Sequence, residues 1–231
     1  MTVKAYPSIN PALYETTRVV IQLLAIALTR GVVVEGKEFI PRKGPFVVAM
    51  NHLSFLDTPL VSITVPQRLY WLVGERYEHH TFTPIIKVTG SIFVRRGEID
   101  REALRQALAA LDAGQVLAVA VEGTRSRSGG LNQGKTGAAY LASRAGAPIL
   151  PTAVWGTEEI GPAWHRWRRA GQTHIRFGQP FSLPEGRARS ADLEHYTEDI
   201  MTRLAAMLPE SYRGVYRDHP GLAAHLAAQP G

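Results

Sequence analysis

Cysteine is absent from this 231-residue chain. Its absence excludes disulfide scaffolds, thiolate metal sites and cysteine nucleophiles. Lysine is scarce as well: five of the 26 basic residues are lysines, and the other 21 are arginines. The planar guanidinium of arginine suits bidentate contacts with phosphate. GC-rich coding also enriches a sequence in arginine, so the composition leaves two explanations open: phosphate binding and coding bias.

Long hydrophobic runs are missing too. The longest strongly apolar stretch extends from Val19 to Leu28 and is interrupted by Gln22. A membrane-spanning helix needs about 20 apolar residues, so we expect no transmembrane segment. A signal peptide is also disfavoured, because the apolar run ahead of the small residues at Ala25–Ala27 is only six residues long and contains Gln22.

The residues that are present describe a basic globular chain. Hydrophobic residues make up 45% of the sequence and charged residues 20%, which is enough apolar material for a sizeable core. This composition excludes disorder, collagen and coiled coil as the main architecture. The net charge of +6 predicts an anionic partner: nucleic acid, a phosphate ligand or an acidic lipid surface.

The N-terminal segment has the pattern of an unusually apolar helix. At about 100° per residue, Glu15, Arg18, Gln22 and Thr29 form one narrow polar stripe, and the other faces are apolar. A surface helix of a soluble domain normally shows the reverse proportion. Such a helix lies either in a protein core or in a membrane interface, and the sequence leaves both open. We divide the chain into this membrane-associating helical segment, residues 1–35, and one domain, residues 36–231.

Strand and helix patterns alternate along the rest of the chain. The expected strands are Pro45–Met50, Leu69–Val73, Ser91–Val94, Gln115–Val121, Pro148–Val154 and His174–Phe177. The expected helices are Ser54–Val65, Thr83–Val88, Glu102–Leu111, Thr136–Arg144 and Ala191–Met207. This alternation predicts a single α/β domain: a largely parallel mixed sheet covered by helices, with the N-terminal helical segment as an appendage.

The first chemically suggestive motif follows the first expected strand. His52 and Asp57 are five residues apart, which on one continuous helix separates them by about 140°. They can meet only if His52 lies on the loop and Asp57 in the first helical turn. The pattern Ser54-x-x-Asp57 resembles a capping box that would begin the helix at the required place. His52 could then act as a general base oriented by Asp57. The alternative is a helix cap beside an ordinary surface histidine.

Three basic turns follow further expected strands. Arg95 and Arg96 end a short strand, Glu122–Arg127 follows the strongest one, and Lys135 begins the next helix. Open α/β sheets bind ligands at the carboxyl edge, where a Gly-Thr-Arg turn offers N–H groups, a hydroxyl and a guanidinium to a phosphate. Each turn alone is typical of a solvated loop, but three of them in one sheet favour an anion site.

These motifs, in this order, resemble the glycerolipid acyltransferases, in particular the 1-acylglycerol-3-phosphate acyltransferases. The stretch Asn51–Asp57 matches the Asn-His-x-Ser-x-x-Asp block of that family. Gly90–Arg96 looks like its Gly-x-Ile-Phe-Ile-Asp-Arg block, and Glu122–Ser126 matches its Glu-Gly-Thr-Arg-Ser block. Ala147–Val154 looks like the hydrophobic block that is linked to acyl-donor binding. The resemblance covers nearly the whole chain.

The resemblance implies a mechanism and a set of site residues. His52 would deprotonate an acceptor hydroxyl that attacks the thioester of acyl-CoA or acyl-carrier protein, and Asp57 would orient His52. The residues implied in binding the phosphate of the acceptor are Arg96, Glu122, Gly123, Thr124, Arg125 and Lys135. Asn51 and Ser54 would support the site, with Ser54 as the helix cap and not as a nucleophile. No metal or other cofactor is expected, because the thioester is already activated.

The sequence departs from the family pattern at three positions. Arg95 stands where the family often has Asp, Val121 where it has Pro, and Gly134 where it has Phe. These differences leave the acceptor open. It is either 1-acylglycerol-3-phosphate, giving phosphatidate, or another polar lysolipid such as an aminolipid or a glycolipid.

Lipid substrates require contact with a membrane. Trp164–Arg169 interleaves aromatic and basic residues, as interfacial anchors over anionic lipid do. The same pattern occurs in nucleic-acid-binding modules, but no nucleic-acid-binding fold motif accompanies it, so we expect no specific nucleic acid partner. With the N-terminal helix as a second anchor, we expect a peripheral protein on the cytoplasmic face of the cell membrane, where both acyl donors occur.

Overall fold

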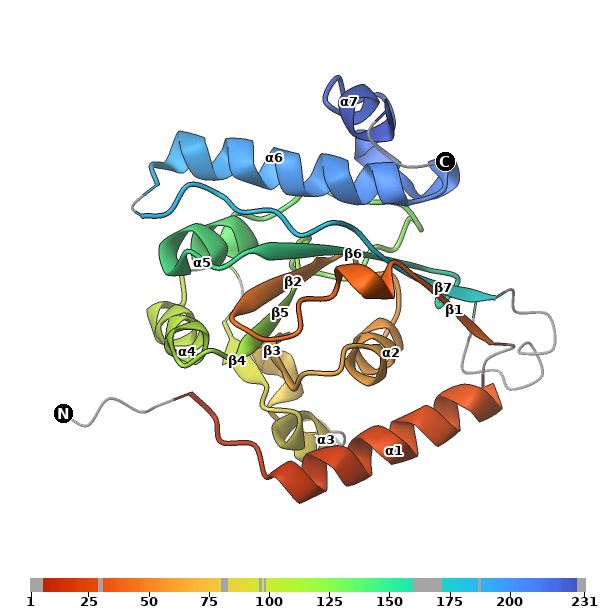
Figure 1. Ribbon diagram of the computed structural model, residues 1–231, viewed down its shortest axis with the longest axis vertical. Coiled ribbons are helices and arrows are strands. Elements are labelled where there is room, and N and C mark those ends of the chain that lie inside the picture. The colour runs from red at the N-terminus through yellow and green to blue at the C-terminus, as the bar shows by residue number, and fades with distance from the viewer. Residues whose placement is uncertain are drawn as a thin grey trace.

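The computed structural model describes residues 6–28, 31–79, 83–95, 97, 99–159, 172–186 and 188–227. Within these residues, seven strands form one sheet in the order β1-β7-β6-β2-β5-β3-β4 (Figure 1). Neighbouring strands are parallel except β6 and β7, which are antiparallel. The strands are β1 (Val32–Glu35), β2 (Phe46–Met50), β3 (Leu69–Gly74), β4 (Ile92–Val94), β5 (Val116–Ala120), β6 (Ile149–Trp155) and β7 (Thr173–Phe177). The predicted single α/β domain with a largely parallel mixed sheet is confirmed.

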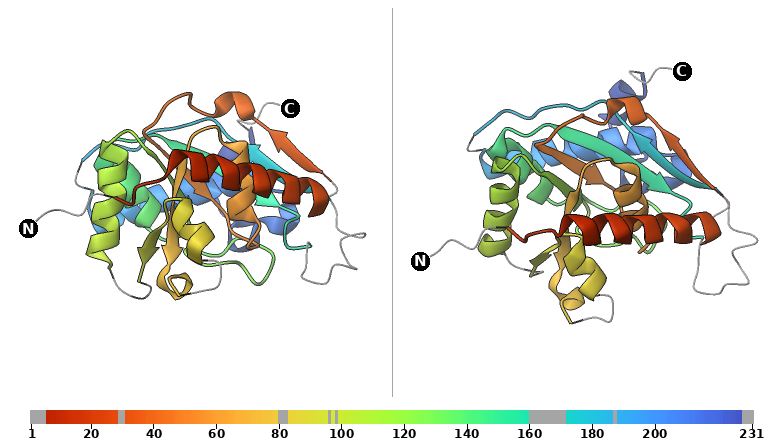
Figure 2. Two further views of the ribbon diagram at one scale, coloured as in Figure 1. Left: turned by 90° about the horizontal axis from the view of Figure 1, so that it is seen from below. Right: turned by 60° about the horizontal axis from the view of Figure 1, so that its bottom comes forward.

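Helices cover both faces of this sheet (Figures 1 and 2). On one face lie α4 (Arg101–Asp112), α5 (Gly137–Ala145) and α6 (Ser190–Met207). On the other lies α2 (Asp57–Thr64), with α1 (Pro11–Leu28) and α3 (Thr83–Val88) beside it. The remaining elements are α7 (Leu222–Ala227) and the short 3-10 turns η1 (Lys37–Phe39), η2 (Glu75–Tyr77), η3 (Glu210–Tyr212) and η4 (Gly214–Tyr216).

The central strand β2 shows why this sheet is covered on both sides. All five of its residues are fully buried. Successive side chains of a strand point to opposite faces. Accordingly Val47 and Ala49 join the core beneath α4, α5 and α6, while Phe46, Val48 and Met50 join the core beneath α2. A continuous apolar strand is typical of a parallel sheet between two helical layers.

Three elements differ from the sequence prediction, which did not include α7. Residues 32–35, which we assigned to the N-terminal helical segment, form the edge strand β1 and pair in parallel with β7. Four half-buried or exposed residues are too short a run to show a strand period. Helix α2 begins at Asp57 and not at Ser54, for a reason that lies in the candidate site.

The N-terminal helix α1 packs on the domain through the buried Tyr14 and the half-buried Arg18, whereas Glu15 and Gln22 of its polar stripe are exposed. Arg18 donates hydrogen bonds to the carbonyl oxygens of Ile63 and Pro66, both at 3.2 Å, where α2 ends. The exposed apolar residues of α1 are Leu13, Val19, Val20, Leu23 and Leu24. The helix is therefore turned the opposite way from an ordinary amphipathic surface helix, with apolar side chains outward. Among the described residues, no helix has the length and hydropathy needed to cross a membrane.

Candidate active site

The candidate site lies at the carboxyl ends of β2 and β5, which are parallel neighbours in the sheet. The loops that follow the two strands are joined by backbone hydrogen bonds. The N–H of Val121 donates to the carbonyl oxygen of Met50 at 2.9 Å, and the N–H of Ser126 donates to that of His52 at 2.7 Å. The loops that follow two separate strands therefore lie side by side at one edge of the sheet.

His52 and Asp57 are in direct contact. Nδ1 of His52 lies 2.9 Å from Oδ2 of Asp57. The same oxygen accepts hydrogen bonds from the backbone N–H groups of Leu53, at 2.7 Å, and Ser54, at 2.8 Å. A carboxylate only accepts hydrogen bonds, so Nδ1 carries the proton. In a neutral imidazole, that assignment leaves the free lone pair on Nε2 of His52.

The turn from His52 to Asp57 explains the late start of α2. The hydroxyl of Ser54 accepts from the N–H of Leu56 at 3.3 Å and does not cap the first turn of the helix. The interpretation of Ser54 as the helix cap is therefore wrong, although the Asp57 carboxylate does reach back to the Ser54 N–H as in a capping box. Because the carboxylate binds three donors of the turn, the turn closes before the helix begins.

Asn51 ties the site to the neighbouring strand β6. Its side chain is fully buried. Nδ2 donates to the carbonyl oxygen of Val154, and Oδ1 accepts from the N–H of the same residue, both at 2.8 Å. The side-chain amide of Asn51 thus continues the β2·β6 ladder one residue beyond β2, which fits the supporting position expected from the sequence.

Glu122 has partners that the sequence did not predict. Its carboxylate is 1% exposed, and Oε1 accepts from the N–H of His52 at 3.0 Å. Oε2 accepts from the backbone N–H and the Nδ2 of Asn132, both at 2.8 Å. Burial raises the pKa of Glu122, and the N–H groups of Asn132 and His52 oppose that effect. These contacts hold the His52 loop in place, while contact between Glu122 and a phosphate stays a prediction.

The other residues expected at a phosphate lie along the rim of a cavity. Thr124 and Lys135 are exposed, and Arg125 is half-buried, with Nη2 donating to Oη of Tyr77 at 3.3 Å. Gly123 has a φ of +67°, and a Cβ there would lie 3.3 Å from Cγ of Lys135. Glycine therefore permits both the turn and the close passage of the lysine stem. Arg96 falls outside the described residues.

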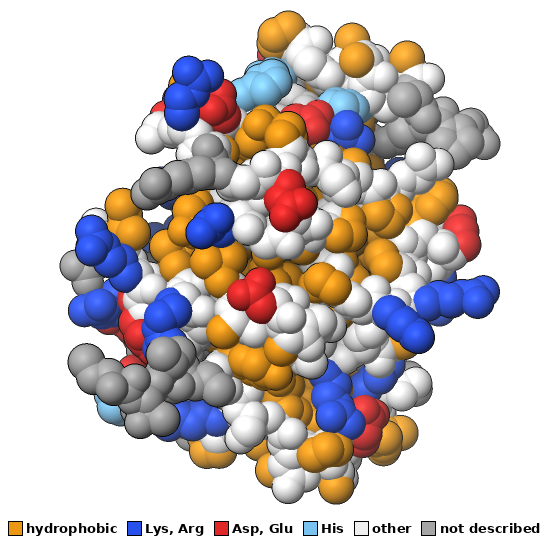
Figure 3. All heavy atoms as spheres, turned by 60° about the vertical axis from the view of Figure 1, so that its left-hand side comes forward, with side chains coloured by type: hydrophobic (Ala, Val, Ile, Leu, Met, Phe, Trp, Pro, Cys, Tyr) orange, Lys and Arg blue, Asp and Glu red, His pale blue; other side chains and the backbone are white. Residues whose placement is uncertain are grey.

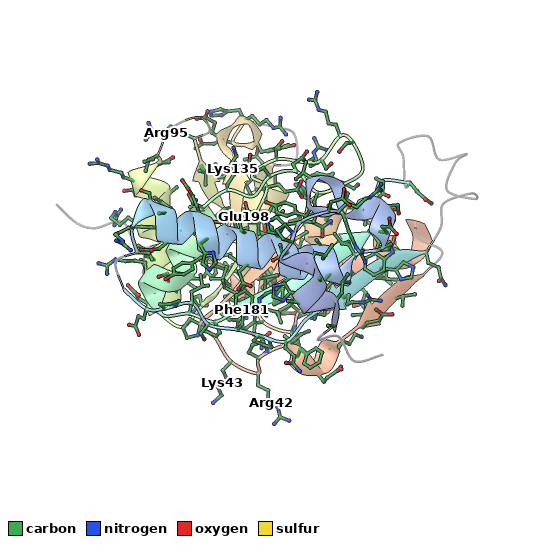
Figure 4. The ribbon with its side chains drawn as sticks, turned by 90° about the horizontal axis from the view of Figure 1, so that it is seen from above. Arg42, Lys43, Arg95, Lys135, Phe181 and Glu198 are labelled. Carbon is green, nitrogen blue, oxygen red and sulfur yellow. The ribbon has the colours of Figure 1, made fainter. Side chains whose placement is uncertain are left out.

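The cavity has a volume of about 730 Å³ and two chemically different parts. His52 lies on its wall together with the cationic residues Arg95, Arg125 and Lys135. Figure 4 shows Arg95 and Lys135 on the same side of the molecule. The apolar part is lined by Ile21, Leu24, Met50, Leu60, Trp71 and Ile86. A base between an apolar wall and a cationic rim can act on the hydroxyl of an amphipathic, anionic molecule.

The surface repeats this combination. On the face shown in Figure 3, Lys and Arg side chains gather along both sides of a central area rich in hydrophobic side chains.

The expected aromatic-basic anchor at Trp164–Arg169 falls outside the described residues. Within the described residues, no cluster of acidic and histidine side chains could hold a metal ion.

Sequence reasoning missed three contacts of the site. The hydroxyl of Thr157 donates to Oδ1 of Asp57, Asn132 binds Glu122, and Tyr77 binds Arg125. Thr157 follows β6, a parallel neighbour of β2, so the strand-end rule that found His52 would have found it too. The same rule reaches Tyr77, which lies in η2 three residues beyond the end of β3, but no comparable signal marks Asn132 in the loop between β5 and α5.

Two curated proteins are similar to this chain in sequence. The chain is 28% identical over 132 residues to a 1-acyl-sn-glycerol-3-phosphate acyltransferase of Borreliella burgdorferi, covering 56% of this chain and 53% of that protein. It is 33% identical over 139 residues to a probable enzyme of the same name from Mycoplasma genitalium, covering 54% and 49%. The chain thus spans about half the length of the curated relatives it matches.

A solved structure shares the fold. The 1-acyl-sn-glycerophosphate acyltransferase of Thermotoga maritima aligns with a TM-score of 0.65 and 24% identity, over 94% of this chain and 81% of that one. At that identity the likeness shows the fold alone. The family evidence is separate: the model of the Acyltransferase family matches residues 31–155, more than half of the sequence. This chain therefore belongs to the acyltransferase family.

Proposed function

We propose that this protein transfers a fatty acyl group from acyl-CoA or acyl-carrier protein to the free hydroxyl of 1-acylglycerol-3-phosphate, making phosphatidate. The observation that carries the proposal is the His52–Asp57 pair, in one cavity between an apolar wall and a cationic rim. An apolar wall suits an acyl chain, and cations suit a phosphate. The names of the two curated relatives support the same acceptor.

The chemistry follows from the position of the ring nitrogens of His52. Nε2 accepts the proton of the acceptor hydroxyl while the hydroxyl oxygen attacks the thioester carbonyl. Asp57 holds the Nδ1 proton and stabilises the imidazolium that forms. When the tetrahedral intermediate collapses, the new C–O bond remains, the C–S bond breaks, and His52 returns the proton to the leaving thiolate. No acyl-enzyme is needed, so Ser54 has no nucleophilic role.

The phosphate of the acceptor is assigned to Gly123, Thr124, Arg125 and Lys135, with Arg96 as a further ligand. Gly123, Thr124 and Lys135 are exposed on the cavity wall, which supports this assignment because an incoming anion can reach them. Glu122 serves the phosphate indirectly in this proposal. Its buried carboxylate would repel an anion at contact distance but holds the loop that carries His52.

Peripheral membrane contact on the cytoplasmic face is part of the same proposal. The outward apolar side of α1 supports it, since Val20 and Leu23 are 50% and 62% exposed. Ile21 and Leu24 of the same helix line the cavity. A lipid acceptor could therefore pass from a bilayer beneath α1 to His52 without crossing water.

Flotation with anionic liposomes tests this contact. Burying one such side chain contributes about 1.5–3 kcal/mol, so the double variant Val20→Ser, Leu23→Ser should weaken binding at least about tenfold. Val215→Ser is the matched control, because Val215 is 67% exposed and lies in η4, shortly before α7, which Figure 1 shows on the opposite side of the molecule from α1. Unchanged flotation of the α1 variant would show that α1 is not the membrane contact.

Product analysis by mass spectrometry tests the activity itself. The enzyme is offered one labelled acyl-CoA, or the corresponding acyl-carrier protein, with a panel of 1-acylglycerol-3-phosphate, a lyso-aminolipid, a lyso-glycolipid and monoacylglycerol. We expect labelled phosphatidate from the wild type and at least about 100-fold less from His52→Ala. Preference for a lysolipid without the phosphate would favour the alternative acceptor. Acylation of no acceptor, or equal acylation by His52→Ala, would overturn the proposal.

A further inference from the structure

Thr157 contacts one oxygen of the Asp57 carboxylate, and the turn that begins at His52 contacts the other. Thr157 is fully buried two residues beyond the end of β6, and its hydroxyl donates to Oδ1 of Asp57. The three other donors to this carboxylate, from residues 52–54, all bind Oδ2. Each carboxylate oxygen is therefore held from a different element of the fold.

The backbone around Thr157 fixes the position of its hydroxyl. Gly156 has a φ of +83°, and a Cβ there would lie 2.4 Å from the carbonyl oxygen of Gln172. Only glycine fits this turn. On the other side, the side-chain amide of Asn51 binds both backbone groups of Val154. The end of β6 is thus registered against the loop that carries His52.

We propose that Thr157 is a positioning residue that acts on His52 through Asp57. Three donors already restrain Oδ2, but the terminal torsion of an aspartate is broad, and the hydroxyl of Thr157 restrains the second oxygen against the remaining motion about the Cβ–Cγ bond. A donor at Oδ1 selects the orientation in which Oδ2 accepts the Nδ1 proton of His52. In the neutral imidazole, that orientation places the proton on Nδ1 and leaves the lone pair of Nε2 available to the acceptor hydroxyl. The consequence for turnover rests on the proposed function, but the consequence for the tautomer of His52 does not.

Two variants of Thr157 separate a positioning role from a packing role. Thr157→Val keeps the shape and removes the donor, and Thr157→Ser keeps the donor and removes a methyl group. Thr202→Val is the matched control, because Thr202 is equally buried but its hydroxyl donates only to backbone carbonyls of α6. Turnover is measured with 1-acylglycerol-3-phosphate and palmitoyl-CoA, and ¹⁵N shifts of labelled histidine report which nitrogen of His52 carries the proton.

We expect Thr157→Val to lower kcat about 10- to 100-fold, the effect of one lost charge-assisted hydrogen bond, while both KM values change less than about twofold. Its His52 spectrum should show a mixture of tautomers. Thr157→Ser should recover kcat to within about threefold of wild type and show a single tautomer, as should Thr202→Val.

Three outcomes would overturn the inference: wild-type kcat in Thr157→Val, equal losses in the Val and Ser variants, or a single Nδ1–H tautomer in Thr157→Val. The last needs no substrate. Absence of acyl transfer by the wild type would contradict the proposed function and not this inference. The comparison of His52 tautomers would still decide the role of Thr157.

Discussion

The two sides of the cavity are built on opposite principles. On the base side, Asp57 has no exposed surface and accepts four hydrogen bonds, and Glu122 is almost as deeply buried. On the cationic side, Lys135 and Thr124 are exposed to solvent. The base side has its polar groups satisfied before any substrate arrives, whereas the cationic side leaves donors for an incoming anion.

This difference separates two kinds of kinetic effect. Groups held in place before binding act mainly on the transition state, so their loss lowers kcat. Groups that meet an acceptor phosphate bind substrate and transition state alike, so their loss raises KM. Substitutions on the two sides therefore test whether kcat effects and KM effects separate in this way.

His52→Ala should have the largest effect. Removing a general base costs about 10²- to 10⁴-fold in kcat, and the acceptor should still bind, since the cationic rim is untouched. Turnover and equilibrium binding of 1-acylglycerol-3-phosphate measure the two effects separately. His195→Ala, on the exposed side of α6, is the control and should behave as wild type. Near-normal turnover in His52→Ala would remove His52 from the reaction.

Glu122→Gln tests whether a residue expected at the phosphate belongs to the base side. Both carboxylate oxygens of Glu122 accept from N–H groups, whereas a carboxamide accepts on one oxygen only. In the variant, the side-chain N–H₂ at position 122 must therefore face an N–H donor of His52 or Asn132. The displaced loop should lower kcat about tenfold, the effect of one lost buried hydrogen bond, and leave the acceptor KM within about threefold. Steady-state kinetics beside Glu194→Gln, an exposed control in α6, measures this. A rise in KM alone would return Glu122 to the phosphate site.

Arg125→Ala tests the cationic side. Losing a charge-assisted contact of about 1.5–3 kcal/mol should raise the KM of phosphate-bearing lysolipids about 10- to 100-fold. Monoacylglycerol, which lacks the phosphate, should hardly be affected. Arg125→Lys should recover part of the loss, because an ammonium keeps the charge but not the fork. Arg127→Ala, in the same loop but not on the cavity wall, is the control. Equal losses for both acceptors would mean that the phosphate binds elsewhere.

The two sides also differ in how far the sequence predicts them. Alternating apolar runs predict six of the strands, and the strand-end rule brings His52 and Arg125 to one edge. The spacing of His52 and Asp57 even predicts the loop-to-helix turn between them. The contacts of Glu122 depend on how two loops register in space, and no local pattern encodes that. The prediction that Ser54 caps α2 is wrong for the same reason. The Asp57 carboxylate accepts from the N–H of Ser54, and the Ser54 hydroxyl accepts from the N–H of Leu56 instead of capping the helix.

Asp100→Asn should have the smallest effect on the acceptor KM. Asp100 contacts Arg95, a cation of the cavity wall. Asp100 caps α4 through the N–H of Ala103 at 3.1 Å and accepts from the N–H of Arg95 at 3.0 Å and its Nε at 3.3 Å. The backbone N–H of Arg95 is the main cause that lowers the pKa of Asp100 from 3.8 to about 2. The folded pKa lies below the unfolded one, so the stabilisation is complete above pH 3.8 and is lost as the pH falls toward 2.

Asparagine caps helices as well as aspartate does but lacks the charge, so the variant should lose about 2 kcal/mol of unfolding free energy at pH 7. Between pH 4 and pH 2 its unfolding free energy should fall less steeply than that of the wild type. Urea unfolding across this range measures both, with Asp112→Asn at the exposed end of α4 as the control. Because the side chain of Arg95 is 57% exposed, the acceptor KM should change less than about threefold. A change as large as that of Arg125→Ala would show that the fold also preorganises the cationic side, and the division between the two sides would fail.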